Sequence, residues 1–161
     1  MQTASRPHEP VALAGIRKLL LGIFAAGVIG TLSELLLLGH FESGLQWIPL
    51  VLLGLGLATA AWHALRPRAL TVRTLQIMTA LFVAAGMLGV GLHYDGNVEF
   101  ELEMTPAMDG FELVRNTLTG ATPVMAPGSM ALLGLIGLAH AYRHPCITPD
   151  DDGIHSGGIR R

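Results

Sequence analysis

Four long apolar stretches, separated by short polar segments, divide the chain. They cover residues 11–38, 47–65, 75–92 and 125–142, and the uninterrupted apolar part of the first begins after Lys18. Each apolar part is about 18–20 residues long, and as an α-helix it would extend about 27–30 Å, close to the thickness of a bilayer hydrocarbon core. Because a single segment crosses lipid only as a hydrogen-bonded helix, the pattern predicts four transmembrane helices.

The composition favours a membrane protein over a soluble domain. The chain has 161 residues, of which 51% are hydrophobic and only 14% charged, and its mean hydropathy is +0.52. A water-soluble domain of this size could not bury so much apolar surface in one core. We therefore expect a lipid bilayer to cover the rest, and the net charge of −2 gives no support for a nucleic-acid partner.

The first apolar stretch resembles a secretory signal in one respect, since Arg17 and Lys18 precede it. However, Leu19 to Leu38 is longer than the usual apolar region of about 7–15 residues, and no A-x-A cleavage pattern follows it. The stretch is therefore expected to stay in the protein as a transmembrane helix.

The distribution of charge predicts the orientation. If the four helices alternate in direction, nine of the ten basic residues share one side and Arg115 alone lies on the other. By the positive-inside rule both termini are cytoplasmic. The sequence shows no transit peptide, so the expected location is the cell membrane of a bacterium, its inner membrane. The nine basic residues are Arg6, Arg17, Lys18, Arg66, Arg68, Arg73, Arg143, Arg160 and Arg161.

The opposite, outer side is predicted to be acidic. Its carboxylates are Glu42, Asp95, Glu99, Glu101, Glu103, Asp109 and Glu112. All tryptophans and tyrosines lie at the ends of apolar stretches, as in the aromatic belt of a membrane protein; they are Trp47, Trp62, Tyr94 and Tyr142.

Small residues recur four positions apart in the first three stretches, and the fourth carries two glycines near its centre. Such positions allow helix backbones to approach closely inside lipid, so we expect an all-α, integral-membrane four-helix bundle. The pairs are Gly22 with Ala26 and Gly30, Gly54 with Ala58, Gly56 with Ala60, Ala80 with Ala84, and Ala85 with Gly89; the two glycines are Gly134 and Gly137.

The outer loop, residues 94–124, is the one long connection. Apolar and polar residues alternate over 97–104, which predicts a short strand or an extended stretch. Phe111, Val114 and Leu118 follow at helical spacing and predict a short amphipathic helix on the mouth of the bundle. The loop would serve as a lid or as a docking surface for a partner.

The two ends of the chain are polar. Residues 1–10 and 143–161 are expected to be disordered on the cytoplasmic side. The chain has one cysteine, Cys146, which excludes an intramolecular disulfide and a cysteine-based metal cage.

Glu34 is the one carboxylate inside an apolar stretch, about 6 Å from its outer end. An ionised carboxylate facing lipid costs a few kcal/mol, so Glu34 is expected to face the bundle interior or to stay protonated. It could serve function, or it could hold two helices together by hydrogen bonding.

Four histidines lie at the ends of the four apolar stretches, His40 and His93 on the outer side and His63 and His140 on the inner side. Three interpretations compete. His40 and His93 could bind a divalent metal, or shuttle protons, together with Glu34. Each pair, His40 with His93 and His63 with His140, could instead ligate a haem. All four could simply prefer the headgroup region, as amphipathic side chains do. His144 lies in polar surroundings and is assigned no role.

No sequence motif identifies a substrate or a reaction, because the chain lacks the phosphate-binding, nucleophile-elbow, zinc-protease and dinucleotide motifs. The leading expectation is a non-enzymatic accessory protein that docks a membrane-protein partner, or a second copy, through its outer loop. The alternative is a metal-binding or redox protein using Glu34, His40 and His93. A third possibility is a component of a proton-coupled transporter.

Overall fold

The computed structural model describes residues 10–120, 124 and 126–147, and this part of the chain is all-helical. Residues 1–9 and 148–161 of the predicted disordered ends lie outside the described residues, whereas residues 143–147 are described and are folded against the end of α5. The helices are α1 (Val11–Leu37), the 3-10 turn η1 (Gly44–Gln46), α2 (Trp47–Leu65), α3 (Ala69–Met104), α4 (Gly110–Thr119) and α5 (Gly128–Ala141).

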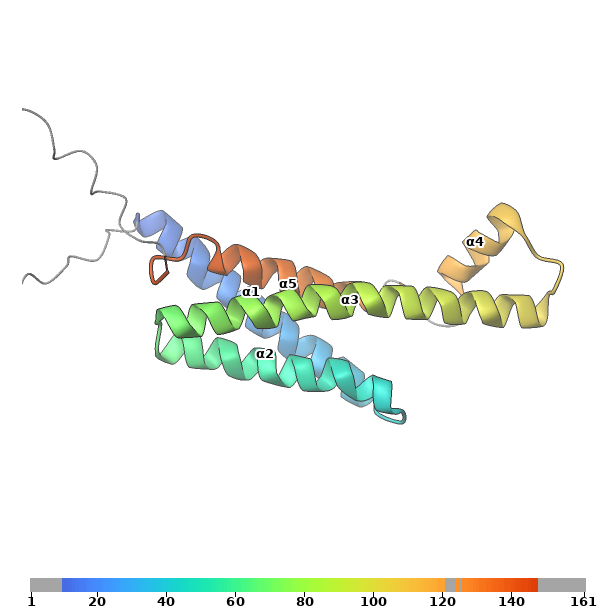
Figure 1. The fold of residues 1–161 in the computed structure, drawn as a ribbon, viewed down its shortest axis with the longest axis horizontal. Helices are drawn as coiled ribbons and strands as arrows, with labels where there is room; N and C mark the ends of the chain where they lie inside the picture. The colour runs from blue at the N-terminus through green and yellow to red at the C-terminus, as the bar shows by residue number, and fades with distance from the viewer. Residues whose placement is uncertain (1–9, 121–123, 125, 148–161) are drawn as a thin grey trace, which may run out of the picture.

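Four of these helices form a bundle in which each helix contacts two others. Helix α1 packs against α2 and α5, and α3 packs against the same two, so that α2 and α5 lie on one diagonal and α1 and α3 on the other. Successive bundle helices run in opposite directions, and α3 extends far beyond the bundle before α4 folds back along it (Figure 1).

Three of the helices are long and apolar enough to cross a membrane: Val11–Leu37, Gly44–Leu65 with its preceding 3-10 turn, and Ala69–Met104. Helix α5 is apolar too, but its 14 residues extend only about 21 Å. The described part of the protein is thus all-helical, with three candidate membrane-spanning helices.

The bundle core is small, and much of the apolar surface faces outward. Phe24 of α1 and Phe82 of α3 are fully buried, with ring centroids 5.7 Å apart, and Leu53 and Leu75 pack in the same cluster. Many large apolar side chains on the outer faces are exposed instead, among them Leu19, with 63% of its surface accessible. Such a distribution suits helices whose solvent is lipid.

Glycine permits the closest helix approach, between α3 and α5. A Cβ added at Gly134 would lie 2.8 Å from the backbone nitrogen of Val83, and one at Gly137 would overlap the side chain of Thr79. By contrast, a Cβ at Gly22 or Gly54 would meet nothing within 4 Å. The small-residue prediction therefore holds for α5. It also holds for Gly56 of α2 and Gly89 of α3, where an added Cβ would overlap Phe82 and Pro127, whereas Gly22 and Gly54 face outward.

The prediction of a strand over residues 97–104 is wrong. Helix α3 continues without interruption through Met104, 12 residues beyond the predicted span end at Leu92. Extending an existing helix costs far less than nucleating a new element, and glutamate, leucine and methionine are strong helix formers. An isolated strand here would also have lacked a partner.

The predicted amphipathic helix is confirmed as α4, although its position differs. It packs against the extended end of α3, where the side-chain amide of buried Asn97 donates a hydrogen bond to the carbonyl of Thr117 over 2.9 Å. The predicted apolar stripe points away from α3, since Phe111 is 82% exposed and Val114 and Leu118 are also exposed. The hairpin formed by the end of α3 and by α4 thus presents an apolar stripe outward.

Candidate metal centre

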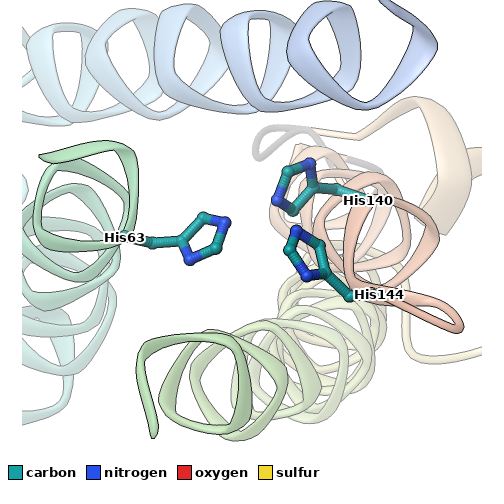
Figure 2. A group of neighbouring side chains, drawn as sticks. All are labelled: His63, His140 and His144. Atoms are coloured by element: carbon teal, nitrogen blue, oxygen red, sulfur yellow. The ribbon is translucent and has the colours of Figure 1, made fainter. Parts of the chain in front are cut away.

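Three histidines converge at the end of the bundle where α1 begins and α5 ends. His63 lies in the last turn of α2, His140 in the last turn of α5, and His144 just beyond the end of α5. All three are buried, and each offers a ring nitrogen within 4.8 Å of those of the other two. Figure 2 shows the rings pointing toward one another across the space between the helices.

The local backbone brings His144 back toward His140. Four positions separate the two residues, but α5 ends at Ala141, so continued helix does not place them on one face. Arg143 adopts a left-handed conformation, with φ of +45°, and turns the chain back. The amide of His144 then donates to the carbonyl of Ala141 over 3.3 Å, which closes the turn.

Thr71 orients the ring of His63. The hydroxyl oxygen of Thr71 lies 3.0 Å from Nδ1 of His63, and also 2.9 Å from the carbonyl of Arg68 and 3.1 Å from that of Arg66. The hydroxyl has one proton, and both carbonyls can only accept. When that proton is donated to a carbonyl, Nδ1 of His63 is the donor to Thr71, and the lone pair of Nε2 is then directed into the cluster.

Arg17 orients the ring of His140 in the same way. Nδ1 of His140 lies 2.9 Å from the backbone carbonyl of Arg17, and it can form that hydrogen bond only as a protonated donor. Nε2 of His140 therefore carries a lone pair in the neutral ring. Metal-bound histidines commonly show this arrangement, in which the second ring nitrogen donates to a carbonyl or a hydroxyl.

His144 has the opposite tautomer. Its Nδ1 accepts a hydrogen bond from the backbone N–H of Cys146 over 3.2 Å, so in this conformation the proton of the neutral ring lies on Nε2. To coordinate a metal through Nε2, His144 would have to move this proton to Nδ1. That change removes the acceptor of the Cys146 hydrogen bond.

The cluster suits a small ion better than a haem. The centroids of His63 and His140 are 5.2 Å apart, as are those of His63 and His144, and the third pair is separated by 5.6 Å. The rings are in direct contact, so no porphyrin fits between them in this arrangement. A tetrahedral zinc ion with bonds of about 2.0–2.1 Å holds its nitrogens about 3.3 Å apart, so binding would draw the ring nitrogens, which lie within 4.8 Å of one another, together by at most about 1.5 Å.

The charges of the ligands and of their surroundings indicate which type of metal ion the cluster suits. The three ligands are neutral imidazoles without a carboxylate among them, and Arg17 contributes a buried positive charge nearby. An ion held mainly by carboxylate and carbonyl oxygens, such as magnesium or calcium, has no suitable partner in this set. Imidazole nitrogen suits zinc, copper, nickel and iron.

The outer site predicted from the sequence is only partly assembled. His40 and His93 are half-buried and close enough to interact electrostatically, and Nδ1 of His93 is buried without a hydrogen-bond partner in the described part of the chain. Glu34 is exposed on the surface of α1, so the expectation that it faces the bundle interior is wrong. One turn from the end of α1, it lies where water can reach a membrane helix. Metal or haem binding at His40 and His93 stays a prediction.

The sequence interpretation included His63 and His140 only as a haem pair and left out His144. A usable signal was present in the i, i+4 spacing of His140 and His144, which is typical of two ligands on one helix. The polar residues between them, Tyr142 and Arg143, made the second histidine look like part of the tail.

Comparison with protein-family models, with curated proteins and with solved structures finds no match.

Proposed function

We propose that this protein binds a divalent transition-metal ion at His63, His140 and His144. The observation that carries the proposal is the convergence of three buried imidazoles, two of which have Nδ1 hydrogen-bonded away from the cluster, to the hydroxyl of Thr71 and to the carbonyl of Arg17. Three protein ligands leave a fourth tetrahedral position for water or an exchangeable ligand. The protein would therefore hold or hand on an ion.

We place this centre at the cytoplasmic end of a four-span bundle. Arg17, in the second turn of α1, donates hydrogen bonds to carbonyls at and beyond the end of α5, so the beginning of α1 and the end of α5 lie at the same level. This arrangement supports a fourth crossing by α5 and its flanking residues, with both termini on one side. The same end carries Arg66, Arg68 and Arg143, as the positive-inside rule requires of the cytoplasmic side.

The test is a zinc titration of the purified full-length protein in detergent, after removal of bound metal with a chelator. We expect one ion per chain for the wild type, and strongly weakened binding for the single substitutions H63Q, H140Q and H144Q. H40Q and H93Q are the matched controls, because they change outer histidines of the same bundle. A wild type that binds no zinc would overturn the proposal, and loss of zinc in the two controls alone would move the site to the outer end.

A second function is supported by the α3–α4 hairpin. We propose that its outward stripe, Phe111, Val114 and Leu118, docks a protein partner on the outer side of the membrane. Asn97 anchors α4 to α3, so the helix can present this stripe to a partner. In the helix-in-groove mode of recognition, the apolar face of such a helix lies in an apolar groove of the partner. The carboxylates of Glu99, Glu103, Asp109 and Glu112 on the same hairpin favour a groove with a basic rim.

Crosslinking from a photoreactive residue at position 114 tests this function in membranes. We expect one crosslinked protein species, lost when Phe111 and Leu118 are both changed to serine and retained when exposed Glu103 is changed to glutamine. Crosslinks only to lipid would contradict partner docking.

A further inference from the structure

Arg17 is a buried cation that connects α1 to the end of α5. One terminal nitrogen of its guanidinium donates to the carbonyl of His140 over 2.6 Å and to that of Tyr142 over 2.9 Å, and the other donates to the carbonyl of Arg143 over 3.0 Å. The last carbonyls of a helix have no partner within the helix, so the guanidinium supplies the donors they need. A cation at this position also interacts favourably with the helix dipole.

The contact is reciprocal. Nδ1 of His140 donates to the backbone carbonyl of Arg17, while the side chain of Arg17 holds the carbonyl of His140. The three carbonyls bound by the guanidinium also flank the left-handed turn at Arg143, which directs His144 into the cluster. One side chain thus touches the segment that positions two of the three candidate ligands.

We propose that Arg17 is a positioning residue for the metal centre, which assembles the half of the site formed by His140 and His144. This inference rests on the proposed metal-binding function. Arg17 does not ligate the ion; it fixes the end of α5 so that both rings are presented to His63. The planar guanidinium fork is required, because a lysine ammonium cannot reach all three carbonyls from one position.

The test compares R17Q and R17K with K18Q in the full-length protein. Lys18 is the matched control, because it is the adjacent cation on α1 but is exposed. Loss of a residue that orients metal ligands lowers metal affinity about 10–100-fold, and we expect a loss of this size for R17Q. R17K should fall between R17Q and the wild type, and K18Q should bind zinc as the wild type does.

A second readout needs no metal. Nitrogen-15 spectra of histidine side chains in the metal-free protein report which ring nitrogen carries the proton. We expect R17Q, and R17K to a smaller extent, to change the signals of His140 and His144 while those of His40 and His93 stay unchanged.

Zinc affinity and the metal-free spectra together distinguish a failure of the metal-binding function from a failure of the positioning role. A wild type without zinc affinity would overturn the metal-binding function, and the metal-free spectra would still test Arg17. Unchanged His140 and His144 signals in both Arg17 variants, or wild-type zinc affinity in R17Q, would overturn the positioning role. If R17Q does not fold, R17K decides the question, since it keeps the charge.

Discussion

The hydroxyl oxygen of Thr71, at the start of α3, is hydrogen-bonded to Nδ1 of His63, at the end of α2, over 3.0 Å. The two residues are eight positions apart and lie on either side of the turn between the helices. When Nδ1 is the donor in this contact, Nε2 of His63 carries the lone pair and is available to a metal.

Replacing Thr71 by valine should weaken zinc binding about 10–100-fold, because valine keeps the shape but offers no acceptor to His63. T71S should restore the affinity, since serine retains the hydroxyl. T74V is the control for loss of a threonine hydroxyl in α3, because that hydroxyl bonds only to the carbonyl of Leu70 within the helix. Competition with a chromogenic chelator measures all three, and wild-type affinity in T71V would show that the contact is irrelevant to the site.

Zinc should release the backbone amide of Cys146. The metal requires the lone pair of Nε2 on His144, so the proton moves to Nδ1, which can no longer accept from that amide. We expect faster hydrogen exchange at the Cys146 amide in the zinc-loaded protein, measured by NMR or mass spectrometry. The amides of α2 provide the internal reference. Equal protection with and without bound zinc would contradict coordination through His144 Nε2.

Glycine at position 134 should be essential to the contact between α3 and α5. G134A places a methyl group against the backbone of Val83, which cannot move aside as a flexible side chain would, and overpacking of this kind costs about 1–3 kcal/mol. G22A adds the same methyl group to an open surface, and there alanine should stabilise the helix by about 0.5–1 kcal/mol. Thermal unfolding in detergent compares the two, and equal effects would refute the close approach.

Asn97 should hold α4 against α3. N97A leaves the buried carbonyl of Thr117 without this donor, and a lost partner of this kind costs about 1–3 kcal/mol. We expect faster hydrogen exchange throughout α4 with little change in the bundle helices. E99A is the control, because Glu99 lies in α3, as Asn97 does, but is exposed. Unchanged exchange in α4 of N97A would show that other contacts hold the hairpin together.

The sequence was sufficient for those features that depend on local periodicity. Apolar stretches of membrane length predicted the long helices, and the spacing of Phe111, Val114 and Leu118 predicted α4. The same approach failed at residues 97–104, where alternation of apolar and polar residues suggested a strand. The alternation covers only eight residues. Continuing α3 from its apolar part costs less free energy than starting a new element, so the helix continues through these residues.

The metal centre could be predicted only in part because it depends on tertiary contacts. The sequence predicts that His63 and His140 lie at the same end on diagonal helices, but it does not give the distance between their rings, which is 5.2 Å. His144 joins them through the left-handed turn at Arg143, and no residue pattern indicates that conformation for arginine. Glu34 was placed inside on energetic grounds, yet the packing of α1 turns it outward.

X-ray absorption spectroscopy at the zinc edge tests the central claim most directly. For the zinc-loaded wild-type protein we expect a first shell of nitrogen and oxygen at about 2.0–2.1 Å, with the outer-shell scattering of three imidazoles. H144Q, if it still binds zinc, should lose the scattering of one imidazole. A spectrum with fewer than two imidazoles, or one that is identical in the wild type and H144Q, would contradict a centre built from His63, His140 and His144.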